Sequence, residues 1–197
     1  DGMETTFMRR LRQGRRRAFI ESYAFPVALK DKVAEELESP SGIALEGLRQ
    51  WYLACLDAPR DVLGMPSRAV DVAWHEMILM TRTYTSFCER AFGHYLHHSP
   101  EAVMDEPMPE SLARTLAVVD ARSAAIVGVP LLFAIDNELG IADGHSWAEE
   151  DVQHLRDHRY YAGGASGYGG SGGCATVSSC GGGGCGGGGG GCGGGGG

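Results

Sequence analysis

The sequence predicts an all-α fold, an irregular bundle of about five helices followed by a disordered tail rich in glycine and cysteine. Apolar residues recur three or four positions apart between residues 27 and 139, which is the period of an amphipathic helix, and no stretch alternates as a strand does. Residues 163–197 hold 22 of the 31 glycines, and a glycine run has no side chains to bury. We therefore expect a basic flexible arm over 1–17, a helical domain over 18–161 and a low-complexity tail over 162–197.

The first two predicted helices lie on either side of a turn. The first opens at Phe25-Pro26, because proline is tolerated at the first helical position, and it runs to about Glu38. The cluster at 39–42 (Ser-Pro-Ser-Gly) is typical of a turn. The second helix is expected over 43–57, where apolar residues recur on one face.

The longest predicted helix covers residues 67–92 and carries most of the potential chemistry. It follows Met65-Pro66 and ends before Gly93, which suits a left-handed cap. Its apolar seam advances by three or four residues through Val70, Trp74, Ile78, Thr81, Thr85, Cys88 and Phe92. Two shorter helices are expected over 110–127 and 131–140, and the polar and aromatic stretch 141–161 is expected to be partly ordered.

Charge and hydropathy exclude several classes of function. The net charge is −8, although the first 17 residues hold six arginines, and an acidic body argues against a nucleic-acid-binding domain. No segment approaches the roughly 18 apolar residues of a membrane span, and no secretory signal is visible. The sequence therefore favours a cytoplasmic protein with a protein partner, in which Cys55 and Cys88 are reduced.

Several sequence blocks carry a family resemblance. They include the stretch from Ser22 to Pro26, the pattern Asp71-x-x-Trp74-His75-x-x-Ile78-Leu79, the pair His97-His98 and the Gly/Cys tail. In this order they resemble bacterial members of the glycine-rich domain-containing protein-like family. The resemblance implies a helical domain with a glycine-rich extension and implies no particular activity. Some relatives have histidine where this chain has Met77, so a ligand set that used that histidine would lose a member here.

Asp71 and His75 are the centre of the candidate site. They are four residues apart on one helix face, and His97 or His98 would reach them if the chain folds back after Gly93. One interpretation is structural, with His75 hydrogen-bonded to Asp71 or to a loop carbonyl. The other is a zinc or copper site, in which His75 and His97 or His98 are ligands and Asp71 either binds the ion or orients His75.

The tail cysteines form a separate candidate site. Cys174, Cys180, Cys185 and Cys192 are spaced 6, 5 and 7 residues apart, which is not the paired spacing of a structural zinc module. Three interpretations remain open: a passive tail, a thiol site for metal or redox chemistry, and a precursor whose tail cysteines are modified after translation.

Enzyme chemistry has little support in the sequence. It contains no phosphate-binding glycine loop followed by lysine, no nucleophile elbow and no His-Glu-x-x-His pattern. The sequence favours a non-enzymatic binding or interaction module. The alternatives are a metal-binding protein that uses Asp71, the histidines or the tail, and a metal-dependent enzyme.

Overall fold

Eight helices make up the part of the chain that the computed structural model describes, residues 2–98, 108–123 and 128–162. They are α1 (Gly2–Ser22), α2 (Val27–Leu37), α3 (Gly42–Asp57), α4 (Arg68–Leu79), α5 (Thr81–Ala91), α6 (Met108–Asp120), α7 (Leu131–Leu139) and α8 (Glu149–Ala162). No strand occurs in these ranges, so the all-α prediction is confirmed. The predicted number of about five helices is wrong, because α1 and α8 were not expected and one expected helix is two.

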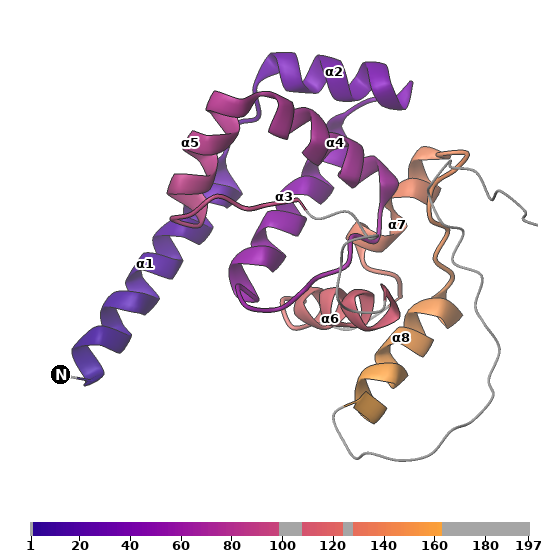
Figure 1. Ribbon diagram of the computed structural model, residues 1–197. Helices are drawn as coiled ribbons and strands as arrows, with labels where there is room; N and C mark the ends of the chain where they lie inside the picture. The colour runs from indigo at the N-terminus through magenta and orange to yellow at the C-terminus, as the bar shows by residue number, and fades with distance from the viewer. Residues whose placement is uncertain (1, 99–107, 124–127, 163–197) are drawn as a thin grey trace, which may run out of the picture.

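Helix α3 is the centre of the fold. It contacts α1, α2, α4, α6 and α7, and Figure 1 shows these helices around it. A helix that is covered on several sides must be apolar on several sides, and nine of its sixteen residues are buried. Gly47 lies where α4 and α7 approach α3, and a Cβ there would overlap with the side chains of Val70 and Ile135. The missing side chain thus allows the close packing that fixes α4.

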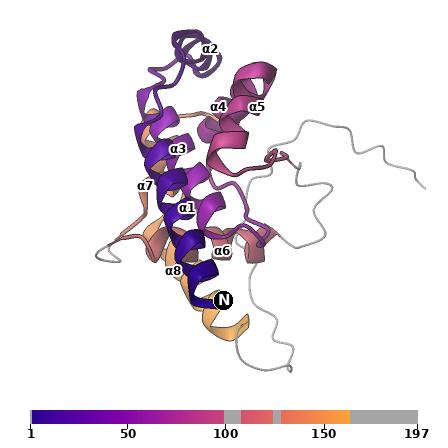
Figure 2. The ribbon, with the colours of Figure 1, turned by 90° about the vertical axis from the view of Figure 1, so that its left-hand side faces the viewer.

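The basic N-terminal segment belongs to a helix. Residues 2–17, predicted as a flexible arm, lie in α1, and the N-terminal end of α1 projects beyond the other helices in Figure 1; Figure 2 shows the same end in front of α8. The C-terminal end of α1 is anchored by Ile20, which is buried, and by an ion pair between Arg17 and Asp57 of α3. The division into parts at residues 17 and 161 stays a prediction.

The helix predicted over 67–92 is interrupted at Met80. This residue has φ −79° and ψ 57°, which ends α4 and begins α5. The interruption changes the helical phase, so the buried face of α5 is formed by Tyr84, Phe87, Cys88 and Ala91, whereas Thr81 and Thr85 of the predicted seam are exposed. The predicted seam is confirmed at Val70, Trp74, Cys88 and Phe92, which are buried.

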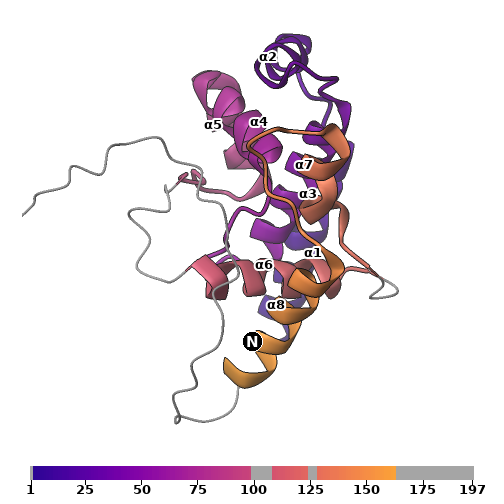
Figure 3. The same cartoon turned by 90° about the vertical axis from the view of Figure 1, so that its right-hand side faces the viewer.

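The C-terminal helices complete the fold. Helix α6 ends at Asp120, earlier than the predicted residue 127, and α7 ends at Leu139, close to the predicted end; the Gly140 that follows is left-handed, with φ 64°. Helix α8 packs on α6 (Figure 3), where Val152 is fully buried and Arg156 forms a salt bridge with Asp120. None of the described helices has the length and hydropathy needed to cross a membrane.

Candidate metal centre

The N-terminus of α4 is held by a buried carboxylate from α7. The Asp136 side chain accepts hydrogen bonds from the Ser67 hydroxyl (2.7 Å) and from the backbone N–H groups of Arg68 (2.7 Å), Ala69 (2.9 Å) and His145 (2.8 Å). The first N–H groups of a helix have no partner within the helix, so this carboxylate satisfies donors that would otherwise be buried without an acceptor. Asp136 therefore fixes the turn from which Asp71 projects.

Asp71 and His75 lie on one face of α4, as the spacing predicted. The Nδ1 atom of His75 is 2.8 Å from the Asp71 carbonyl oxygen and 3.4 Å from the Asp71 carboxylate oxygen Oδ2. Because a carbonyl oxygen only accepts, Nδ1 carries the hydrogen in that bond and Nε2 retains its lone pair. This hydrogen-bonding pattern is the usual one for a histidine that binds a metal through its other nitrogen.

His98 reaches the same face from the segment that follows α5. The chain turns at Gly93, where φ is 79°, and returns along α4. Tyr84 anchors this return, because its hydroxyl accepts from Trp74 Nε1 (2.9 Å) and donates to the Leu96 carbonyl (2.6 Å). Burial raises the pKa of Tyr84 well above its ordinary value, so the phenol remains a donor at neutral pH. The His98 ring then packs edge-on against Trp74, 4.6 Å between ring centroids.

The three side chains form a compact group of ligand atoms. The distance from His98 Nε2 to Asp71 Oδ1 is 2.9 Å, and one ligand atom from each of Asp71, His75 and His98 lies within 4.8 Å of the others. Metal–ligand bonds of about 2.0–2.1 Å separate neighbouring ligand atoms by about 3.0–3.4 Å, so the three side chains would have to move closer together to bind one ion. Without an ion, the proton on Nε2 of His98 forms the hydrogen bond to Asp71. A metal ion would take the place of that proton, and the proton would be released.

The group borders a large cavity. Its volume is about 800 Å³, within the range for sites that bind small molecules, and its lining includes Asp71, His75 and His98. His98 is mostly covered, with 17% of its side chain exposed, whereas 36% of Asp71 and 52% of His75 are exposed. Three protein ligands beside an open space leave coordination positions for water or a small molecule, as in catalytic rather than structural metal sites.

One thiol also lines this cavity but lies outside the three-residue group. Cys55 of α3 also lines the cavity, and burial raises the pKa of its thiol far above the ordinary value. Cys55 does not belong to the group formed by Asp71, His75 and His98. The donor set of that group is two imidazoles and one carboxylate, without sulfur.

The other predicted ligand residues are not part of this group in the described structure. His97 lies next to His98 in the sequence, but its ring packs against Tyr95 (4.9 Å between centroids) and it does not belong to the three-residue group. Cys174, Cys180, Cys185 and Cys192 lie outside the described residues.

Met77 is fully buried, with its sulfur 3.3 Å from the Tyr52 hydroxyl. Position 77 therefore faces the core, and the group around Asp71 does not depend on a histidine there.

Two residues that position the site were missed in the sequence. Asp136 lies between apolar residues of α7 and shares their face, and an acidic residue on an apolar face is a signal for a buried hydrogen-bond network. Tyr84 carries no such signal, because its phase on the helix depends on the interruption at Met80.

The hydrogen bond from Tyr84 to the segment that carries His98 can be tested by mutation. Tyr84→Phe removes the hydrogen bond to the Leu96 carbonyl and frees the segment that carries His98, so we expect about a tenfold weaker affinity for zinc with the helical content unchanged. Tyr95→Phe is the matched control, since Tyr95 lies beside Tyr84 (5.1 Å between centroids) and is partly exposed. Titration calorimetry measures the zinc affinity of both variants. Equal affinities would mean that the Tyr84 hydroxyl does not hold His98 in place.

Comparison with known proteins places the chain in a family. No curated protein and no solved structure matches it. The UCP032817-like family matches residues 15–168, a span that covers more than half of the chain and includes Asp71, His75, His98 and Asp136. The chain therefore belongs to the UCP032817-like family.

Proposed function

We propose that the protein binds one divalent transition-metal ion through Asp71, His75 and His98 and presents it to a ligand in the adjoining cavity. The observation that carries the proposal is the convergence of the three ligand atoms within 4.8 Å at the cavity wall. The chain has brought them together from two segments, since Asp71 and His98 are 27 residues apart. Two imidazoles and a carboxylate suit zinc and iron(II).

Several features support a metal over a purely structural cluster. The Asp71 carboxylate lies in the first turn of α4, which already favours a negative charge, and therefore needs no second partner for stability. His75 is half exposed and contributes little to the core. The site also opens onto a cavity, whereas a structural hydrogen-bond cluster gains nothing from open space.

Zinc titration tests the proposal. The four tail cysteines are replaced by serine in the full chain, and this tail-serine variant is titrated with zinc. We expect one zinc per chain, and no measurable binding when Asp71→Ala is added. An unchanged titration after Asp71→Ala, or no binding in the tail-serine variant, would contradict the proposal.

A second candidate function is an interaction module without catalysis. The projecting end of α1 exposes Phe7, Met8 and Leu11, which recur at helical spacing. This apolar face fits a protein partner. A partner identified by proximity labelling should be lost in Phe7→Ser/Leu11→Ser, and a partner retained by that variant would count against this function.

A further inference from the structure

The cavity beside the candidate metal centre is positively charged, although the protein is not. The chain has a formal net charge of −8, yet the cavity is lined by Arg9, Arg12, Arg16 and Arg68, against Asp61 and Asp71 alone among acidic residues of the described chain. Asp71 belongs to the metal group, and Arg68 forms an ion pair with Asp143 (3.0 Å). The excess positive charge therefore lies on α1.

The three cavity-lining arginines of α1, Arg9, Arg12 and Arg16, have no acidic partner among the described residues, whereas several other arginines of the fold have one. Arg17 pairs with Asp57, Arg49 with Glu46 and Arg156 with Asp120. Arg9, Arg12 and Arg16 line one wall of the cavity at helical spacing. Unpaired guanidinium groups on a cavity wall are suited to bind carboxylate or phosphate.

Arg16 lies against the segment that also carries His98. It is half buried, and a Cβ at Gly93 would overlap with its guanidinium group. The φ of 79° at residue 93 favours glycine, and the guanidinium group of Arg16 lies beside it. The arginine wall and the metal group are consequently joined by one short stretch of chain, residues 93–98.

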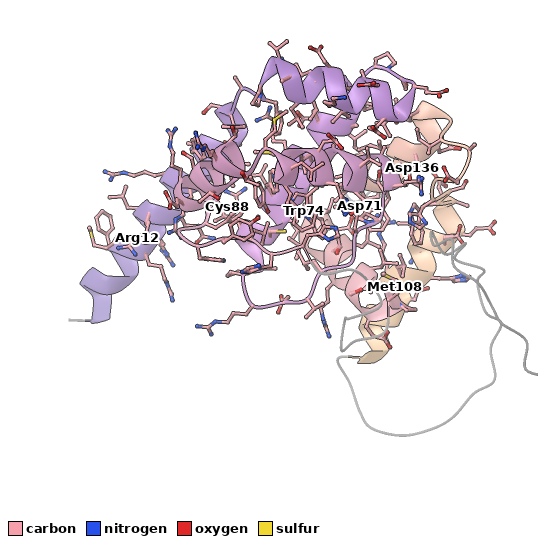
Figure 4. The ribbon with its side chains drawn as sticks, turned by 45° about the horizontal axis from the view of Figure 1, so that its top comes forward. Arg12, Asp71, Trp74, Cys88, Met108 and Asp136 are labelled. Atoms are coloured by element: carbon pink, nitrogen blue, oxygen red, sulfur yellow. The ribbon has the colours of Figure 1, made fainter. Side chains whose placement is uncertain are left out.

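Aromatic and apolar side chains line the cavity between the arginines of α1 and the metal group. Figure 4 shows Arg12 on α1 well apart from Asp71, with Trp74 between them in this view. Trp51 and Phe92 also line the cavity. The Trp51 indole is only 3% exposed, and its N–H has no acceptor in the part of the chain described, so an oxygen of a bound molecule would satisfy a buried donor.

We infer that the cavity takes an elongated organic anion, whose carboxylate or phosphate is bound by Arg12 and Arg16, whose apolar body lies along Trp51 and Trp74, and whose far end reaches the metal. This inference rests on the proposed function for the far end only. The anionic end and the apolar body of the ligand are inferred from the arginines and the aromatic side chains that line the cavity, without the metal.

Binding of simple amphiphiles tests the inference. Octanoate, octyl phosphate, octanol and inorganic phosphate are titrated into the zinc-loaded full chain below their aggregation concentrations. We expect the two anionic amphiphiles to bind at least tenfold more tightly than octanol and inorganic phosphate. Which of the two binds more tightly identifies the head group as carboxylate or phosphate. Equal affinity for octanoate, octyl phosphate and octanol would overturn the inference.

Matched variants on one helix locate the anionic end. Arg12→Gln/Arg16→Gln should weaken the tighter amphiphile at least tenfold, whereas Arg10→Gln/Arg15→Gln removes the same charge from residues that do not line the cavity and should have little effect. Equal losses in the two double variants would overturn the inference. The methyl end of these probes cannot bind zinc, so their arginine-dependent binding should persist in Asp71→Ala; its loss there would mean that the anionic head group binds at the metal, which would overturn the assignment of that end to Arg12 and Arg16. A failed zinc titration alone refutes the proposed function.

Discussion

Replacing His98 by alanine is expected to lower the affinity of the tail-serine variant for zinc by at least about 100-fold, because it removes one of three ligands. The remaining pair, Asp71 and His75, sits on one exposed helix face and has no third donor within reach among the described residues. The fold should survive, since His98 contributes a ring contact with Trp74 and no hydrogen bond to the core. Zinc titration with circular dichroism as the folding control measures both effects.

His97→Ala is the matched control for this prediction. It changes the same residue type at the neighbouring position and removes only the ring contact with Tyr95. Its zinc affinity should stay within about threefold of the parent. A comparable loss in His97→Ala and His98→Ala would mean that the segment as a whole, rather than the His98 imidazole, supports binding.

Asp136→Ala is expected to lower the free energy of unfolding by about 3 kcal/mol, because it leaves buried donors without an acceptor. Asp136 accepts four hydrogen bonds, of which the Ser67, Arg68 and Ala69 bonds hold the start of α4. Since Asp71 projects from that turn, zinc affinity should fall as well. Urea denaturation followed by circular dichroism gives the free energy, with the unchanged slope as the test of two-state behaviour.

Asp143→Ala supplies the comparison. It removes a carboxylate that pairs with Arg68 at the surface, where 67% of the Asp143 side chain is exposed. An exposed pair contributes less than about 1 kcal/mol. If Asp136→Ala costs no more than Asp143→Ala, Asp136 does not hold the α4 N-terminus in the way described.

The helices that the sequence predicted well are those with local signals. Pro26 precedes α2, the turn at 39–42 separates α2 from α3, and Gly140 ends α7 in the left-handed conformation. Each of these depends on the backbone preference of one or two residues, which sequence shows directly. Helix α8 was missed because its sequence is highly charged, and among its residues 149–157, whose burial is described, only Val152 and Leu155 are buried apolar positions.

The candidate site was only partly predictable for a different reason. The spacing of Asp71 and His75 places them on one helix face, and this required no tertiary information. The choice between His97 and His98 depends on how the segment after Gly93 returns to α4, which the Trp74–Tyr84–Leu96 hydrogen bonds determine. The arginine wall depends on α1 passing beside that segment. Such contacts between distant segments leave no periodic trace in the sequence.

X-ray absorption at the zinc edge of the wild-type full chain, loaded with one equivalent of zinc, tests the central claim most directly. Because the tail cysteines are present, they compete with the site in the fold. We predict nitrogen and oxygen ligands at about 2.0–2.2 Å, with imidazole scattering from two histidines and no sulfur. A sulfur shell at about 2.3 Å, or no histidine scattering, would place the ion elsewhere and contradict a metal centre at Asp71, His75 and His98.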